Sequence, residues 1–244
     1  MPNKESNYQL SVVVPCFNEE ENIPELVRRL QEVFKNNNIA GEIVFVDDGS
    51  KDATSQRAGE YKAQYPNINC IQHSRNQGIV AGWQTGARNA KSDYVVIIDA
   101  DMQYAPEDIP ALYFELMKGE HDIVQGWRQT YDDSNYRFIL SAGFSKMLNL
   151  IFGLNLNDIK SGFLATGKQK FLHIFDHRYH YNFYQHLITI SAVSKGYTIK
   201  QIPVKFNQRY KGKSFITSPI TFSLKAVLEL PKAFWEFRVL SRKH

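Results

Sequence analysis

Residues 94–103 read YVVIIDADMQ, and they decide the fold because an apolar, β-branched run passes directly into two carboxylates. Such a short run is typical of a strand buried on both faces of a parallel sheet. Three similar runs precede it, at residues 9–14, 42–46 and 68–73. Helical periodicity predicts a helix at residues 23–34, and we also expect a polar helix at 52–65 and a helix at 78–89. This alternation predicts an α/β fold with a parallel sheet, right-handed crossovers and helices on both faces.

The second half of the chain is less regular. The patterns predict helices at residues 106–118, 137–152 and 181–195, a polar loop at 128–136 and extended segments at 122–125, 161–166 and 198–206. A last helical stretch, residues 220–240, is expected to be interrupted at Pro231. Gly82 and Gly86, at helical spacing, are expected to let their helix pack closely on the sheet. We predict a main domain over residues 1–215 and an amphipathic C-terminal segment over residues 216–244.

The composition is that of a globular protein, because 43% of the 244 residues are hydrophobic and 22% are charged. Cys16 and Cys70 form neither a disulfide framework nor a paired metal motif, which favours a reducing, cytoplasmic compartment. The N-terminus lacks the pattern of a secretion signal. No run of about 18 apolar residues occurs, so we expect any membrane contact to be peripheral.

Basic charge is concentrated near the C-terminus. Residues 195–244 hold 11 of the 29 Lys and Arg residues but only two of the 25 acidic residues, Glu229 and Glu236. A cationic end suits nucleic acid, an anionic membrane surface or phosphate groups, and charge alone leaves all three open. Nucleic acid is not expected as a partner, because no RNA-recognition motif accompanies the charge.

Acidic loops follow three of the predicted strands, and in open α/β sheets ligands bind at the carboxyl ends of parallel strands. The loops are PCFNEE at residues 15–20, DDGS at 47–50 and DADMQ at 99–103. The first loop lacks the G-x-G-x-x-G of a dinucleotide-binding fold, and the chain has no G-x-x-x-x-G-K-[ST] phosphate loop. Both of those classes are therefore excluded.

Asp99 and Asp101 can share one cation. Alternate residues of an extended segment point to the same side, so these carboxylates and the Gln103 amide can converge on Mg²⁺ or Mn²⁺. Such ions prefer oxygen ligands and keep positions open for a diphosphate, whose developing charge they stabilise. An isolated Asp-x-Asp is more often a solvated turn, but this one follows a buried strand and accompanies two other acidic loops.

Four blocks of sequence together carry a family resemblance: VVVPCFNEEENIPELV (12–27), EIVFVDDGSKDAT (42–54), the run from RNQG to EDIP (75–110) and DIVQGWR (122–128). In this order they resemble family 2 glycosyltransferases with the GT-A fold, and most closely the dolichol-phosphate or polyprenol-phosphate mannose synthases. The resemblance extends from about Leu10 to Ser214. It implies a Rossmann-like, mixed but mainly parallel sheet and a catalytic domain over residues 1–215.

The resemblance implies a nucleotide-sugar site in the strand-end loops. The positions that match the family's nucleobase, ribose and pocket residues are Pro15, Asn18, Glu19, Asp47, Asp48 and Arg75. Asp99 resembles the residue near the ribose and diphosphate, and Asp101 and Gln103 resemble metal ligands. Asp48-Gly49-Ser50 also has the composition of a simple turn. The R-x-x-G-x-S block at residues 209–214 implies a cationic loop over the diphosphate, with Arg209 and Lys213 as candidates.

The acceptor side is similar to that of the mannose synthase group. Arg128, Arg137 and Ser141 match positions that hold the phosphate of the acceptor lipid, and guanidinium groups suit a phosphate. The alternative for Arg137 is that it merely opens a helix at a membrane-facing surface.

Two positions depart from the family pattern. DIKSGF at residues 158–163 resembles D-x-x-S-G-F, which usually continues with Arg, but Leu164 stands there. The contact expected from that Arg is therefore missing or supplied elsewhere. His186 stands near the position of an acidic residue of the family, although a histidine there is more often a core residue. These departures bear on the donor sugar more than on the reaction class.

The C-terminal segment is amphipathic, with a polar stripe of Lys225, Glu229, Lys232 and Glu236 beside a wide apolar face that includes Trp235. This pattern is typical of a helix that lies in a lipid headgroup layer, although an apolar stripe also packs on its own domain. Because the resemblance implies a lipid acceptor, we expect contact with a membrane surface.

The resemblance predicts an inverting, metal-dependent glycosyltransferase that moves a hexose from a GDP- or UDP-sugar to a polyprenyl or dolichyl phosphate at the cytoplasmic face of a membrane. GDP-mannose is the first donor to expect, ahead of UDP-glucose and UDP-N-acetylglucosamine. The acceptor phosphate is already an anion, so positioning and charge neutralisation can replace a strong base. Two alternatives stay open: an enzyme acting on a glycan, polymer or protein, and a membrane-bound nucleotide-sugar-binding protein without turnover. Protein partners and oligomeric state stay open as well.

Overall fold

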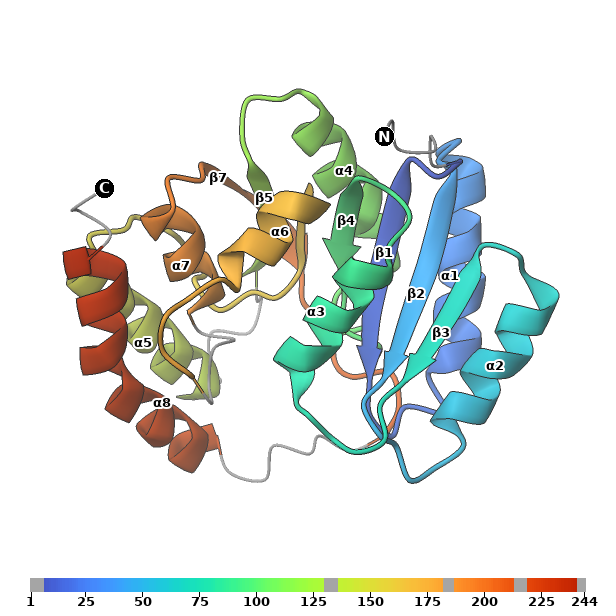
Figure 1. Cartoon of the computed structure of the whole chain (residues 1–244), viewed down its shortest axis with the longest axis horizontal. Helices are drawn as coiled ribbons and strands as arrows, with labels where there is room; N and C mark the ends of the chain where they lie inside the picture. Colours follow the sequence, from blue (N-terminus) through green and yellow to red (C-terminus); the bar gives the residue numbers. More distant parts are fainter. Residues whose placement is uncertain (1–6, 130–135, 182–186, 213–218, 241–244) are drawn as a thin grey trace.

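The computed structural model describes residues 7–129, 136–181, 187–212 and 219–240, which form one seven-stranded sheet flanked by helices (Figure 1). The strands are β1 (Leu10–Cys16), β2 (Gly41–Asp47), β3 (Ile68–Gln72), β4 (Tyr94–Ile97), β5 (Ile123–Gln129), β6 (Leu164–Gly167) and β7 (Ile199–Lys205). Their order across the sheet is β3-β2-β1-β4-β6-β5-β7. Neighbours pair in parallel except at β6, which runs antiparallel to β4 and β5. The four parallel N-terminal strands are confirmed, and the sheet as a whole is mixed.

Helices cover both faces of the sheet, as predicted. They are α1 (Ile23–Asn36), α2 (Thr54–Gln64), α3 (Ile79–Asn89), α4 (Ile109–Met117), α5 (Tyr136–Phe152), α6 (Lys168–Ile174), α7 (Ile188–Ser194) and α8 (Pro219–Phe234), with a 3₁₀ turn, η1 (Pro106–Asp108), before α4 and a π-helical end, η3 (Trp235–Leu240), after α8. Val12 and Val14 of β1 pack in the core that α1 covers, and Val13 packs in the core that α3 covers. Figure 1 shows α3 in front of the strands and α1 behind them.

Two glycines bring α3 close to β1. A Cβ atom added at Gly86 would lie 2.2 Å from Cγ1 of Val13, and one added at Gly82 would lie 3.0 Å from Cβ of Pro15. The predicted role of these glycines in close packing is confirmed. The approach brings the first turns of α3 to the carboxyl end of β1, where the first acidic loop begins.

The second half of the chain departs from the sequence-based predictions in several places. β5 continues to Gln129, so Arg128 belongs to a strand rather than to the predicted loop. The sequence pattern does not reveal α6, because seven residues are too few to show a helical period. Of the helix predicted over residues 181–195 the structure describes α7, and residues 182–186 lie outside the described residues.

The C-terminal helix continues through Pro231 instead of breaking there. Leu230, Ala233 and Phe237 are buried in the same core as α3, and this packing offsets the backbone hydrogen bond that a proline removes. Leu228, in contrast, is 77% exposed. One side of the segment therefore packs on its own domain and another side is open, while the boundary after residue 215 stays a prediction. Among the described residues, no helix is both long and apolar enough to cross a membrane.

Candidate active site

The loops that follow β1 and β2 are tied together at the carboxyl edge of the sheet. The backbone N–H of Asn18 donates to Oγ of Ser50 at 2.9 Å, and the backbone N–H of Glu19 donates to Oγ1 of Thr54 at 2.8 Å. These bonds join the predicted PCFNEE and DDGS loops into one surface, because the carboxyl ends of adjacent parallel strands lie side by side.

Asn18 acts as a link between these loops. Its φ of 55° lies in the left-handed region, which asparagine tolerates better than most residues. Its Oδ1 accepts a hydrogen bond of 2.8 Å from the backbone N–H of Lys51. Pro15, in contrast, lies inside β1 and packs against the position of Gly82. Asn18 therefore holds the two loops together, and Pro15 contacts α3 at the end of β1.

Asp48 holds the loop after β3 through its buried carboxylate. Its Oδ1 accepts from the backbone N–H of Gln77 at 2.9 Å and lies 2.7 Å from Nδ1 of His73. Its Oδ2 accepts from the backbone N–H of Gly78 at 2.7 Å. Nε2 of His73 in turn lies 3.0 Å from Oγ1 of Thr85 on α3. The predicted nucleotide ligand Asp48 is thus fully engaged by the protein itself, and it fixes the loop that carries Arg75.

Arg75 is exposed in this loop and lies against the DDGS turn. Gly49 adopts a φ of 75°, and a Cβ atom there would lie 2.6 Å from the carbonyl carbon of Arg75. Only glycine allows this approach of the two backbones. The structure therefore places the Arg75 backbone against the DDGS turn, and its role at a nucleotide site stays a prediction.

Asp47 lines a cavity of about 230 Å³ between β2, β3 and α2. Its Oδ1 accepts a hydrogen bond of 3.0 Å from the backbone N–H of Ser50. Its Oδ2 is buried and has no hydrogen-bond partner among the residues that the structure describes. Because a buried acceptor without a donor is costly, this oxygen is suited to an N–H group of a ligand. Lys62 and Gln72 also line the cavity.

Three carboxylates, those of Glu19, Asp99 and Asp101, gather at the ends of β1 and β4. Arg209 joins two of them, because its Nη1 lies 2.7 Å from Oε1 of Glu19 and its Nη2 lies 3.0 Å from Oδ2 of Asp101. The sequence predicts Arg209 as a ligand of the donor diphosphate. The structure places its guanidinium directly against the acidic cluster.

The carboxyl groups of the cluster have perturbed pKa values, chiefly because they are buried. Burial raises the pKa of Asp99 to about 7, with repulsion from Asp101 and Glu19 adding to the effect and Arg209 and Arg128 opposing it. Burial also raises the pKa of Glu19 and of Asp101, although Arg209 lowers both. Carboxyl groups with strongly perturbed pKa values at the carboxyl ends of strands are typical of a functional site that receives a cation.

The donor set suits a hard divalent cation. Asp101 Oδ1 accepts a 3.0 Å hydrogen bond from the backbone N–H of Gln103, across Met102, whose φ of 57° is left-handed. Within the described ranges no three acidic, histidine or cysteine side chains form a closed metal cage. Mg²⁺ and Mn²⁺ do not need one, because one or two carboxylates and the phosphates of a substrate complete their shell. Asp99, Asp101 and Gln103 would hold such an ion, which supplies charge neutralisation at a leaving diphosphate.

The loop after β7 folds over the Asp99–Gln103 segment. The backbone N–H of Asn207 donates to the carbonyl of Gln103 at 2.8 Å, and that of Tyr210 donates to the carbonyl of Asp101 at 3.2 Å. The side-chain amide of Asn22 donates to the carbonyl of Lys211 at 3.3 Å. This placement supports the predicted cationic loop, whose second candidate, Lys213, lies outside the described residues.

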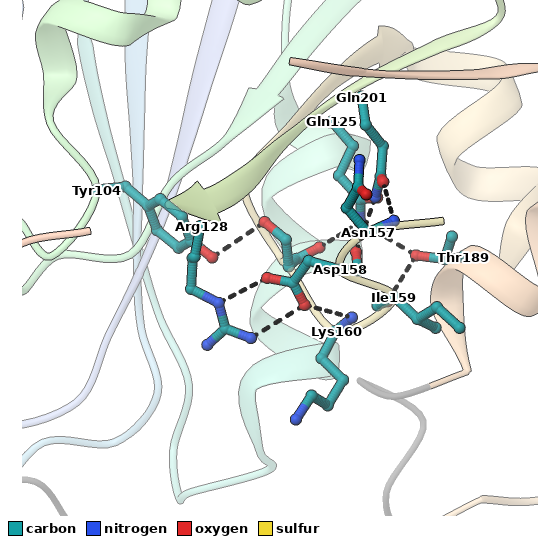
Figure 2. A network of polar contacts seen from close by, with 10 residues as sticks. Tyr104, Gln125, Arg128, Asn157, Asp158, Ile159, Lys160, Thr189 and Gln201 are labelled. Atoms are coloured by element: carbon teal, nitrogen blue, oxygen red, sulfur yellow. Dashed lines mark hydrogen bonds and ion pairs between the residues drawn. The ribbon is translucent and has the colours of Figure 1, made fainter. Parts of the chain in front are cut away.

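Arg128 pairs with Asp158 through a two-pronged contact (Figure 2). Its Nε lies 2.6 Å from Oδ2 and its Nη2 lies 3.0 Å from Oδ1 of that carboxylate. The guanidinium carbon lies 5.2 Å from the centre of the Phe206 ring, and Asp99 attracts the same charge. Arg128 is therefore a fixed cation beside the acidic cluster, which suits its predicted role with a phosphate.

A buried polar network supports the Asp158 loop. Gln125 Nε2 donates to the carbonyl of Ser161 at 2.7 Å, and Gln201 Nε2 donates to Oε1 of Gln125 at 2.7 Å and to the carbonyl of Asp158 at 2.9 Å. The Tyr104 hydroxyl lies 3.0 Å from Oγ of Ser161. Figure 2 shows these side chains converging on the loop from β5, β7 and the segment after β4.

The sequence patterns do not single out three further residues of this region: Asp158, Gln125 and Gln201. Gln125 gave one usable signal, because it follows an apolar pair in its strand and a polar residue there is buried only when it finds partners. Asn22, directly before α1, contacts both Glu19 and the Arg209 loop. Its side chain makes no capping bond.

Several predicted residues cannot be placed by their side chains. Arg137 and Ser141 lie on α5, but their side chains are outside the described part of the structure. His186 also lies outside the described residues. Leu164 is 2% exposed and faces the core from β6.

The Asp-x-Asp after the fourth strand, the acidic loops beside it and the cationic loop above it define the class of GT-A glycosyltransferases. The sequence model of "Glycosyl transferase family 2" matches residues 11–184, and the chain belongs to this family. The predicted family is confirmed.

Curated relatives include enzymes named for lipid-linked phosphates. The chain is 30% identical over 237 residues to a dolichol-phosphate mannosyltransferase of Pyrococcus furiosus, covering 93% of this chain and 64% of that protein. It is 34% identical over 152 residues to a dodecaprenyl-phosphate galacturonate synthase of Rhizobium johnstonii, covering 62% of this chain and 45% of that protein. The chain thus spans less than two thirds of the length of these relatives.

Solved structures share the fold. Glucosyl-3-phosphoglycerate synthase from Mycobacterium tuberculosis, crystallised with Mn²⁺, UDP and glucosyl-3-phosphoglycerate, superposes with a TM-score of 0.68 at 17% identity, covering 94% of this chain and 81% of that one. A mannosyltransferase from Pyrobaculum calidifontis with GDP-Man and Mn²⁺ has a TM-score of 0.68 at 18% identity, covering 95% of this chain and 66% of that one. The predicted GT-A fold is confirmed by this likeness.

Proposed function

We propose that this protein is an inverting glycosyltransferase that moves a hexose from a nucleotide sugar to a polyprenyl or dolichyl phosphate. The observation that carries the proposal is that two cations from different elements lie near the Asp99 and Asp101 carboxylates: Arg209, whose Nη2 is 3.0 Å from Oδ2 of Asp101, and Arg128 of β5, and both lower the pKa of Asp99. The first cation belongs to the loop over the donor site, and the second belongs to the strand of the acceptor site. Asp99 would therefore lie between the donor and the acceptor.

On the donor side, Asp47 would accept an N–H group of the nucleobase at the cavity mouth, and Glu19 and Arg75 would contact the nucleotide. Asn18 and Asp48 would position the loops around it, because the protein already engages both side chains. Arg209, with Lys213, would contact the diphosphate. Mg²⁺ or Mn²⁺ at Asp99, Asp101 and Gln103 fits this arrangement, and the structural relatives crystallised with Mn²⁺ support it.

On the acceptor side, a phosphate oxygen of the lipid attacks the anomeric carbon of the sugar. A new C–O bond forms on one face while the bond from that carbon to the diphosphate oxygen breaks on the other, and the nucleoside diphosphate leaves. The attacking oxygen already carries charge near neutral pH, so no proton must be removed from it. Arg128, Arg137 and Ser141 would hold the phosphate, so that catalysis depends on orientation and charge neutralisation.

Membrane contact through the C-terminal segment is part of this proposal. Leu150 at the end of α5 is 85% exposed, Leu228 is 77% exposed and Trp235 is 53% exposed. Exposed apolar side chains of this size, with a tryptophan and nearby cations, suit the headgroup layer of a membrane. The unpaired thiols of Cys16 and Cys70 fit a reducing compartment, and hence the cytoplasmic face.

The test supplies purified protein and polyprenyl phosphate in detergent with labelled GDP-mannose, UDP-glucose or UDP-N-acetylglucosamine, and measures label in the organic extract. We expect GDP-mannose to label the lipid in Mn²⁺ or Mg²⁺ but not in EDTA. An Asp101→Asn variant should give no label, and Glu120→Gln, at an exposed distant site, serves as its control. Label in a glycan or protein instead would identify another acceptor. Donor binding without any product would indicate a sensor.

A further inference from the structure

Lys160 stands beside the Arg128–Asp158 pair. The backbone N–H of Lys160 donates to Oδ1 of Asp158 at 3.1 Å, and Arg128 Nη2 lies 3.0 Å from the same oxygen. One carboxylate oxygen thus fixes the lysine backbone relative to the guanidinium. Figure 2 shows the side chains of Arg128 and Lys160 flanking the Asp158 carboxylate.

The ammonium group of Lys160 experiences an unfavourable field. Burial and the positive charge of Arg128 lower its pKa to about 8, and Asp158 opposes them only in part. Two positive charges therefore lie near one carboxylate in a partly buried place. An anion that bound between them would relieve the repulsion and favour the charged form of the lysine.

Lys160 also faces the acceptor helix. Its Nζ lies 5.5 Å from the centre of the Phe144 ring, which belongs to α5. The same helix carries Arg137 about two turns before Phe144 and Ser141 about one turn before it. The lysine is therefore located between β5, which supplies Arg128, and the helix that the family resemblance assigns to the acceptor phosphate.

Leu164 cannot supply the cation that the family pattern places there. It lies in β6 opposite Ile97 and Gln125, and its side chain is buried in the core. Lys160 lies four residues earlier, in the loop that leads into this strand. It offers a positive charge at the acceptor side of the loop without placing that charge in the core.

We infer that Lys160 binds the phosphate of the acceptor lipid together with Arg128 and so supplies the positive charge that Leu164 lacks. This inference rests on the proposed function. The ligand is a phosphate group, and the donor diphosphate is its only other source in the reaction. Separate measurements with acceptor and donor distinguish the two.

The experiment compares Lys160→Met, Lys160→Arg and the wild type in the lipid-labelling reaction, with acceptor and donor varied in turn. Lys118→Met is the matched control, because Lys118 is exposed at the end of α4 and pairs with Glu115. We expect Lys160→Met to raise the acceptor KM about tenfold or more and to leave the donor KM within about twofold. Lys160→Arg should recover most of the loss, and Lys118→Met should match the wild type. Lys160→Gln replaces the Met variant if thermal unfolding shows that the latter is not folded.

An unchanged acceptor KM in a folded Lys160 variant overturns the inference and leaves the proposed function intact. A rise in the donor KM alone also overturns it, since it assigns the lysine to the diphosphate. A wild-type protein that labels no lipid phosphate with any donor overturns the proposed function and this inference together.

Discussion

Arg209 Nη1 lies 2.7 Å from Glu19 Oε1, although the two residues are 190 positions apart in the chain. The same guanidinium contacts Asp101. One cation from the C-terminal part of the chain thus pairs with two carboxylates that follow β1 and β4. Burial raises the pKa of Glu19, and the Arg209 contact offsets only part of this rise. The cationic loop is therefore held by the carboxylates that a donor and its metal would engage.

Replacing Arg209 with Gln should weaken donor binding. The variant loses a charge that neutralises both the cluster and a bound diphosphate, so we expect the Kd of a nucleoside diphosphate to rise about tenfold or more. Titration calorimetry with GDP and UDP in Mn²⁺ measures this. Lys211→Gln, exposed two residues away, is the control. Equal affinities in the two variants would show that Arg209 does not bind the donor.

Asp99 should make stability depend on pH. Its pKa is about 7 in the folded protein and about 3.9 when unfolded, so the folded state retains a proton that the unfolded state has lost. The free energy of unfolding should therefore fall as the pH rises from about 4 to about 7, and Asp99→Asn should reduce that fall. Thermal unfolding in EDTA at several pH values tests this. Identical pH slopes in both proteins would contradict the assigned pKa.

Mn²⁺ should offset the loss of stability that the ionised Asp99 carboxylate causes above pH 7. Mn²⁺ bound at the proposed site would stabilise the ionised carboxylates of Asp99 and Asp101, so it should raise the Tm of the wild type more at pH 7.5 than at pH 5, values chosen to bracket the pKa of about 7. The measurement is thermal unfolding with and without Mn²⁺. Asp101→Asn should lose most of the increase, whereas the exposed-site variant Glu120→Gln should retain it. A Tm that Mn²⁺ leaves unchanged at both pH values would argue against the metal site.

The Arg128–Asp158 pair should matter for stability. Asp158→Asn leaves a partly buried guanidinium without its carboxylate, and we expect a loss of about 3 kcal/mol in the free energy of unfolding. The surface pair of Glu115 and Lys118 is the matched control, where Glu115→Gln should leave the free energy of unfolding nearly unchanged. Urea unfolding of both variants gives the comparison. Equal losses would mean that the first pair contributes no more than a surface pair.

The two helical glycines Gly86 and Gly59 should respond to alanine in opposite ways. A Cβ at Gly86 would lie 2.2 Å from Val13, so Gly86→Ala should destabilise the fold by about 1–3 kcal/mol. Nothing lies within 4 Å of a Cβ at Gly59, and there alanine should stabilise α2 by about 0.5–1 kcal/mol. Chemical denaturation measures both. A neutral Gly86→Ala would show that α3 can move off β1.

The sequence predicted the N-terminal half of the fold well because its signals are local. The runs that became β1 to β4 are short and apolar, and the helices between them repeat every three to four residues. β6 was predicted as extended, but its antiparallel direction depends on partners far along the chain, which periodicity does not contain. α8 continues through Pro231 because Leu230 and Ala233 are buried, and the local rule for proline omits that packing.

The sequence by itself determined the family and the acidic strand ends, because these depend on residue types in order along the chain. Only the tertiary structure decided which of those residues are already held by hydrogen bonds or ion pairs within the protein. Asp48 proves to hold a loop, while Asp47 keeps a buried oxygen without a hydrogen-bond partner among the described residues, although the two are neighbours. It also joined Arg209 to Glu19, and Arg128 and Lys160 to Asp158. Hydrogen bonds and charge interactions act over a few ångströms in space, and distance along the chain does not specify them.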